Sequence, residues 1–210
     1  MAKILHLIAS PRGEQSYSLR TAEAFLKSYL DAHPGDEVEA LNLHDGAVPA
    51  FGRLCATGKY RIMSGKEQTD EEREAWKAVV DAIDQFKSAD KLVISSPMWN
   101  FGIPYVLKQY LDVIVQPNYT FSVSPEEGYR GLITGKPAIL FLARGGEYLP
   151  GTGGEGLDYQ KPYLEFILGF IGFERITTIV VEPTLQGGAK AAEVKMNEAV
   201  EKARAQMGQF

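Results

Sequence analysis

The chain lacks features that several classes of protein require. It has one cysteine in 210 residues, Cys55, so it cannot form an internal disulfide and lacks the companions that a structural zinc site needs. No run of about 18 apolar residues occurs, so no membrane span is predicted. Lys and Arg total 22 against 27 Asp and Glu, with no basic block. A net charge of −5 without a clustered positive patch argues against a nucleic-acid partner.

Two further absences bear on location and chemistry. The N-terminus leads directly into an apolar segment at 3–8, without the long apolar core or cleavage site of a secretory signal, so we expect a cytoplasmic protein. No cluster of His, Cys, Asp and Glu follows a predicted strand, so no metal site is predicted. His6, His33 and His44 are interpreted as structural or surface residues. There is also no Gly-x-Ser-x-Gly elbow for acyl transfer.

Short apolar segments alternate with amphipathic ones along the whole chain, which predicts a doubly wound α/β fold. We expect one domain over residues 1–210, with five parallel strands and helices on both faces of the sheet. The patterns leave two strand orders open, 2-1-3-4-5 and 3-2-1-4-5. The predicted strands are 3–8, 37–43, 91–95, 137–143 and 176–182, and the predicted helices are 19–32, 69–86, 104–115, 159–171 and 189–206. Residues 44–68 are expected to be irregular, and 117–135 to form an aromatic loop with a small hairpin around 119–123.

In such a sheet, ligands bind beyond the carboxyl ends of the strands. The segments 9–18, 96–103 and 144–157 should therefore line one site. The first contains Ser10, Ser16 and Ser18 and leads into a helix, whose free N–H groups and dipole favour an anion. The alternative is that Ser16 or Ser18 only caps that helix.

The other two segments suit a flat ligand. Trp99 and Phe101 can flank a planar ring while Asn100 pairs with its polar edge, although core packing is the commoner fate of such aromatics. Gly145 and Gly146 allow backbone N–H groups to approach a ligand, or else form a loop without one. No acid–base pair is evident, which is typical of a site whose cofactor carries the chemistry.

Together these motifs resemble the FMN-dependent NADH-azoreductases, also described as NADH:quinone oxidoreductases, which have a flavodoxin-like fold. The resemblance covers nearly the whole chain and rests on Ser10 with Ser16–Ser18, Pro97–Phe101, Tyr119–Phe121, Gly131–Lys136, Arg144–Gly146 and Phe166–Gly172. It implies the strand order 2-1-3-4-5. It also implies that the FMN phosphate is held by Ser10, Ser16, Tyr17 and Ser18, that the isoalloxazine ring is lined by Pro97, Met98, Trp99, Asn100 and Phe101, and that its pyrimidine end is approached by Ala143, Arg144, Gly145 and Gly146.

The same resemblance implies an activity. NADH or NADPH would pass a hydride to N5 of FMN, and a quinone or azo compound would then be reduced at the same face in a ping-pong sequence, with no catalytic side chain. The family implies a homodimer, with Tyr119 and Phe121 bordering the partner's pocket. Trp99 stands where a tyrosine is common and Ala143 where a serine is common, so the acceptor range is expected to differ. The alternatives are a flavodoxin-type electron carrier and a non-catalytic flavin-binding module. The long segments 44–68 and 117–135 favour an enzyme.

Overall fold

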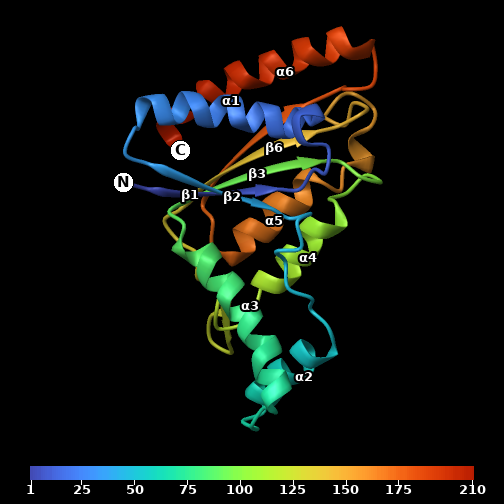
Figure 1. The fold of residues 1–210 in the computed structure, drawn as a ribbon. Coiled ribbons are helices and arrows are strands. Elements are labelled where there is room, and N and C mark those ends of the chain that lie inside the picture. The colour runs from blue at the N-terminus through green and yellow to red at the C-terminus, as the bar shows by residue number, and fades with distance from the viewer.

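The computed structural model describes residues 1–210 and contains a five-stranded parallel sheet (Figure 1). The strand order is β2-β1-β3-β6-β7, which is the predicted 2-1-3-4-5 once the two strands of a separate hairpin are left out of the count. The order 3-2-1-4-5 is therefore wrong. The strands of the sheet are β1 (Lys3–Ile8), β2 (Glu37–Asn42), β3 (Lys91–Pro97), β6 (Pro137–Ala143) and β7 (Arg175–Val181).

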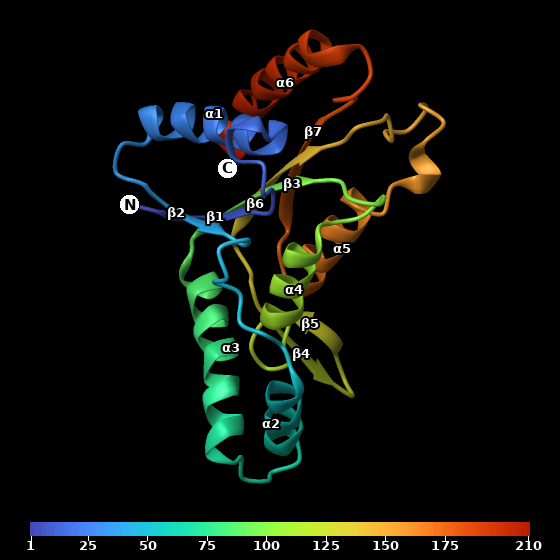
Figure 2. The ribbon, with the colours of Figure 1, turned by 45° about the vertical axis from the view of Figure 1, so that its right-hand side comes forward.

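Helices cover both faces of the sheet, as predicted. Figure 1 shows α1 and α6 on one face and α3, α4 and α5 on the other. The sixth helix, α2, packs beside α3 away from the sheet (Figure 2). The helices are α1 (Tyr17–Ala32), α2 (Arg53–Met63), α3 (Asp70–Ser88), α4 (Tyr105–Ile114), α5 (Lys161–Ile171) and α6 (Gly188–Arg204). No helix is both long and apolar enough to cross a membrane.

Each face of the sheet has its own core because the central strands are apolar on both sides. Every residue of β6 is buried. Ile139 and Phe141 belong to the cluster beneath α1 and α6, whereas Leu140 and Leu142 belong to the larger cluster beneath α3, α4 and α5. Strands buried on two faces read as continuous apolar segments, which is why their bounds were predicted to within a few residues.

Helix α3 begins where its capping box predicts. The Thr69 hydroxyl accepts a hydrogen bond from the Glu72 N–H at 3.2 Å, and the Glu72 carboxylate accepts from the Thr69 N–H at 2.9 Å. Each bond satisfies a backbone donor that the first helical turn leaves without an intrahelical partner.

Helix α2 is the main departure, because 44–68 was expected to be irregular. The helix has no side-chain N-cap at Gly52, and it has a glycine, a weak helix former, at position 58 in its middle. That glycine lets α2 approach α3 closely: a Cβ at Gly58 would lie 2.8 Å from Gln68 Nε2 and 3.1 Å from the Glu72 carbonyl oxygen. Packing against α3 thus stabilises a helix whose local signals are weak.

The predicted hairpin is present but begins later in the chain. Its strands are β4 (Phe121–Ser124) and β5 (Gly128–Gly131), and it packs beside α5. Gly131 permits this contact, since a Cβ there would lie 2.3 Å from the Gly172 backbone nitrogen.

Candidate functional site

The segments after β1, β3 and β6 meet at the carboxyl edge of the sheet, on the right-hand side of Figure 1. Backbone hydrogen bonds join them in sequence across the strands. The Ala9 N–H donates to the Ser95 carbonyl at 2.9 Å, the Met98 N–H to the Ala143 carbonyl at 2.8 Å, and the Arg144 N–H to the Val181 carbonyl at 3.0 Å. The three predicted segments are therefore brought together.

The first segment ends in the capped N-terminus of α1. The Ser16 hydroxyl accepts from the Leu19 N–H at 3.3 Å and lies 3.1 Å from the Ser18 hydroxyl. Ser10, Ser16 and Ser18 are all buried, and the Ser18 side chain has no exposed surface. The capping alternative is thus correct for Ser16, but its hydroxyl only accepts in the cap, so its hydrogen remains available to Ser18 or to an anion.

Backbone donors around Ser16 are also present and free. The backbone N–H groups of Gly13, Glu14, Tyr17 and Ser18 donate to no acceptor within the protein. They lie in a turn over Gly13–Gln15 and in the first turn of α1, where the helix dipole is positive. Several free N–H groups beside two linked hydroxyls form a cradle that fits a phosphate group.

The second segment is a strained turn. Trp99 and Gly102 exchange backbone hydrogen bonds of 3.0 and 2.9 Å across Asn100 and Phe101. Asn100 has φ 48° and Phe101 has φ 68°, so both lie in the left-handed region. Asparagine tolerates this conformation, but phenylalanine is held there at a cost of roughly 1–3 kcal/mol.

The surroundings keep Phe101 in that conformation. Its carbonyl accepts from the Tyr159 N–H at 3.0 Å, and its ring lies edge-on to the Tyr148 ring with centroids 6.2 Å apart. The Phe101 side chain is 44% exposed, so it is not a core residue. A strained, exposed aromatic at a strand end indicates a binding surface.

Trp99 belongs to an aromatic group that the sequence interpretation missed in part. Its ring centroid lies 6.1 Å from that of His44 and 6.2 Å from that of Tyr105. His44 Nε2 lies 3.3 Å from the Ala9 carbonyl oxygen. His44 comes directly after β2, just as the three predicted segments come directly after their strands. This position alone could have placed His44 at the carboxyl edge of the sheet.

The third segment carries its two glycines in close contact with neighbours. A Cβ at Gly145 would lie 2.7 Å from Leu185 Cδ1, and one at Gly146 would lie 3.2 Å from the Tyr148 hydroxyl. Any larger residue would displace Leu185 or Tyr148. The backbone at 145–146 is therefore close to both side chains that rim this end of the site.

The Arg144 side chain does not face the site. Its guanidinium is fully buried and forms ion pairs with Asp158 at 2.9 Å and Glu182 at 3.3 Å. His6 is also behind the site, with Nε2 3.0 Å from the Ser95 hydroxyl, and burial lowers its pKa to about 4. His6 is thus structural, as interpreted from the sequence.

Tyr119 and Phe121 do not join the other predicted residues within one chain. The Tyr119 hydroxyl accepts a hydrogen bond from Trp76 Nε1 at 3.4 Å, and the ring centroids of Phe121 and Phe170 are 4.9 Å apart. Phe170 is near the end of α5, whereas the Arg144 contacts are at its beginning. A helix of 11 residues separates these ends by about 16 Å.

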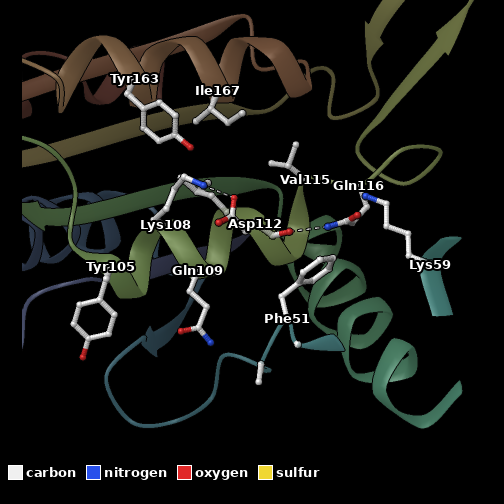
Figure 3. A pocket seen from close by; sticks show the side chains of 13 residues that line it. Phe51, Lys59, Tyr105, Lys108, Gln109, Asp112, Val115, Gln116, Tyr163 and Ile167 are labelled. Atoms are coloured by element: carbon white, nitrogen blue, oxygen red, sulfur yellow. Dashed lines mark hydrogen bonds and ion pairs between the residues drawn. The ribbon is translucent and has the colours of Figure 1, made fainter. Parts of the chain in front are cut away.

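A cavity of about 820 Å³ runs along α4 and α5 (Figure 3). Tyr105, which contacts Trp99, lines it near the beginning of α4, and Gln116 and Lys59 line it beyond the end of that helix. Burial lowers the pKa of Lys59. Gln116 is 2% exposed and its Oε1 has no partner in the protein. The cavity thus combines aromatic and aliphatic walls with polar side chains, among them Lys59 and the Lys108–Asp112 ion pair, and it begins beside the strained turn.

Three aromatic side chains on α4, α5 and the hairpin, the elements near this cavity, are exposed. Tyr105, Tyr129 and Phe166 are each about two-thirds exposed (67%, 69% and 67%). The rings of Tyr129 and Phe166 both lie against Phe170. Exposed apolar patches of this kind mark interaction surfaces in soluble proteins.

Comparisons with known proteins agree with this geometry. A family model described as "Flavodoxin-like fold" matches residues 2–207. A relative from Nitratidesulfovibrio vulgaris (strain DP4), named FMN-dependent NADH:quinone oxidoreductase, is 51% identical over 204 residues, covering 97% of each chain. The crystal structure of an azoreductase from Bacillus anthracis str. Sterne superimposes with a TM-score of 0.90 at 34% identity, covering 100% of both chains. That of an FMN-dependent NADH-azoreductase from Bacillus anthracis str. Ames Ancestor, in complex with FMN, has a TM-score of 0.89 at 28% identity, covering 99% of each chain.

Proposed function

The chain belongs to the family of FMN-dependent NADH:quinone oxidoreductases with a flavodoxin-like fold, and from this membership we propose its substrates and the roles of its residues. It is an FMN-dependent oxidoreductase. We propose that it takes electrons from NADH or NADPH and reduces quinones and azo compounds, in the cytoplasm, by a ping-pong sequence. Residues 1–210 would form one FMN-binding domain.

One observation carries the proposal: a phosphate-sized cradle of free N–H groups and a turn of exposed aromatics lie at the same sheet edge. Ser10, Ser16, Tyr17 and Ser18 would hold the phosphate. The free backbone N–H groups of Tyr17 and Ser18 would donate to it, and so would the Ser16 hydroxyl, which accepts in the cap and keeps its own hydrogen to donate. The ring would be lined by Pro97, Met98, Trp99, Asn100 and Phe101, and its pyrimidine end by Ala143, Gly145 and Gly146.

Bound FMN would supply the redox chemistry, hydride acceptance from a nicotinamide and two-electron transfer to an acceptor. The protein residues supply orientation and electrostatics. The Trp99–Gly102 turn presents aromatic side chains and the Asn100 amide to a flat ligand. Backbone N–H groups near Gly145 and Gly146 favour negative charge at the pyrimidine end. No side chain is required as an acid or base.

The cavity along α4 and α5 supports an enzyme rather than an electron carrier. An electron carrier needs only an exposed ring edge, whereas this cavity is large enough for a flat acceptor and begins beside Trp99. Trp99 stands where a tyrosine is common in the family. Its wider indole ring would shape the range of acceptors.

We also propose that a second copy of the chain covers the exposed aromatic side chains near the cavity. Tyr105, Tyr129 and Phe166 would then be buried, and the hairpin that carries Phe121 would reach the partner's site. Tyr119 and Phe121 would thus contact substrate across the interface rather than within their own chain.

Steady-state kinetics of the FMN-loaded protein test this function. NADH oxidation is measured with a series of quinone concentrations at several NADH concentrations, and then with an azo dye. We expect parallel lines in a double-reciprocal plot, because donor and acceptor occupy one face in turn. Intersecting lines would contradict the ping-pong sequence, and a rate of NADH oxidation that does not depend on the acceptor would contradict the proposed quinone and azo substrates.

A further inference from the structure

A fully buried arginine lies behind the proposed ring site and carries more contacts than a structural ion pair needs. The Arg144 guanidinium contacts Asp158 Oδ2 at 2.9 Å and Glu182 Oε2 at 3.3 Å, and its Nε donates to Gln160 Oε1 at 3.1 Å. All four side chains are buried: 0% for Arg144, 8% for Asp158 and 5% for Glu182 by side chain, and 0% for Gln160. Buried charge clusters seldom add net stability, because desolvation offsets their attraction. We therefore expect the cluster to fix the positions of the segments that it contacts rather than to add stability.

Each partner of Arg144 holds a different segment of the site. The Glu182 carboxylate accepts from the Tyr148 N–H at 3.1 Å and the Leu149 N–H at 2.8 Å, which ties down the segment after β6. The Asp158 carboxylate accepts from the Gln160 and Lys161 N–H groups at 3.0 Å each, at the beginning of α5.

Three further bonds extend the network to neighbouring strands. Gln160 Nε2 donates to the Ser96 carbonyl at 3.4 Å, next to the strained turn after β3. The Arg144 carbonyl accepts from both the N–H and the hydroxyl of Thr184 after β7, each at 2.9 Å. Arg144 thus joins the segments after β6 and β7 directly and reaches the end of β3 through Gln160.

None of these bonds reaches the serine segment at 10–18. The Arg144 network therefore holds the half of the site proposed for the ring and makes no bond to the half proposed for the phosphate, which adjoins it through the bond from the Ala9 N–H to the Ser95 carbonyl. We propose that Arg144 is a positioning residue that fixes the ring half alone, so that its loss weakens recognition of the isoalloxazine ring without affecting recognition of the phosphate. This inference rests on the proposed FMN site.

The guanidinium is suited to this role and an ammonium group is not. Arginine presents five N–H donors in a rigid planar fork, whereas the ammonium of lysine is a point charge on a flexible stem. A lysine at this position could pair with one carboxylate but could not also hold Gln160 and the second carboxylate. The variant R144K should therefore recover only part of the loss.

The test compares FMN with riboflavin, which has the ring but no phosphate. Affinities are measured by quenching of flavin fluorescence for wild type, R144M, R144K and S16A/S18A. We expect R144M to weaken FMN and riboflavin binding by the same factor, about 10-fold to 100-fold, as expected for a small displacement of positioned groups. S16A/S18A should weaken FMN binding and leave riboflavin binding unchanged.

The matched control is R61M. Arg61 forms an ion pair with the buried Glu72 carboxylate at 3.0 Å, between α2 and α3 and away from the proposed ring site. The variant R61M thus removes an arginine–carboxylate ion pair, as R144M does, but at a different place in the fold. We expect R61M to change neither flavin affinity, so an equal effect of R61M and R144M would overturn the proposal. A loss of FMN affinity alone in R144M would also overturn it.

R144M leaves two buried carboxylates unpaired and can fail to fold for that reason. The triple variant R144M/D158N/E182Q removes all three charges at nearly constant volume, and it should show the same equal loss for both flavins. Unchanged binding in a folded triple variant would refute a positioning role.

Amide hydrogen exchange of the FMN-free protein separates this proposal from the proposed function. If Arg144 holds the ring half, amides at 97–103 and 144–149 exchange faster in the triple variant, while those at 10–18 do not. Wild type that binds neither flavin would contradict the proposed function. The exchange pattern would still test the positioning role of Arg144, because unchanged exchange at 144–149 in the triple variant would refute that role.

Discussion

Removal of the serine hydroxyls provides the sharpest test of the phosphate half of the site. In wild type the Ser16 hydroxyl caps α1 through the Leu19 N–H at 3.3 Å and contacts the Ser18 hydroxyl at 3.1 Å. Loss of the cap in S16A/S18A should lower the free energy of unfolding by about 0.5–2 kcal/mol. Loss of a hydrogen bond to a charged phosphate should cost about 1–3 kcal/mol of FMN binding. That range corresponds to a roughly 5-fold to 150-fold higher Kd for FMN.

The two effects can be separated with a matched cap variant. Thr69 caps α3 through the Glu72 N–H at 3.2 Å, so T69A should lose a similar amount of stability in urea unfolding. Its affinity for FMN, measured by fluorescence titration, should not change. If S16A/S18A binds FMN as tightly as wild type, the phosphate lies elsewhere and the assignment of this segment is refuted.

Three further predictions concern strain, pH and assembly. F101G relieves about 1–3 kcal/mol of left-handed strain at φ 68° and adds about 0.5–1 kcal/mol of backbone entropy cost. The free energy of unfolding in urea should therefore stay the same or rise by up to about 2.5 kcal/mol while FMN affinity falls, and a large loss of stability would show that the ring is core. Burial lowers the His6 pKa from 6.5 to about 4, so between these values the unfolded chain binds a proton that the folded chain does not. The contribution of this residue should therefore lower the free energy of unfolding of wild type by about 2 kcal/mol as the pH falls from 7 to 5. In H6Q that part of the slope should vanish in urea unfolding, and an identical slope in both proteins would refute the assignment. F166E places a charge on a side chain that is 67% exposed, so light scattering should show a monomer of unchanged stability, whereas a persistent dimer would place the interface on another face.

The main elements could be predicted from the sequence because their signals are local. Residues Pro137–Ala143 form a strand with the predicted bounds, since an unbroken apolar segment suits only a strand buried on both faces. The Thr69–Glu72 capping box begins α3. The sheet edge that carries the candidate site could be predicted for a related reason, because parallel strands bring their carboxyl ends to one edge.

Local signals were insufficient where packing overrides them. Helix α2 lacks a side-chain cap and contains a central glycine. Its contact with α3 joins residues that no helical or strand repeat connects, so a pattern in the sequence does not predict it. The left-handed Asn100 and Phe101 contradict the ordinary preference of phenylalanine, so no propensity predicts that turn. His44 was read as structural or surface, because its sequence neighbours do not reveal that Trp99 and Tyr105 lie beside it.

By itself the sequence determined the α/β alternation, the strand ends that meet, and the serine-rich segment at the N-terminus of α1. These depend on periodicity, capping and turn residues, which act over a few positions along the chain. Only the tertiary structure decided that the Arg144 guanidinium lies behind the site rather than in it, and that Phe121 lies at the far end of α5 from the remaining site residues. Side-chain direction depends on which distant elements pack together, and the carboxylates that hold Arg144 come from residues 14 and 38 positions away in the chain.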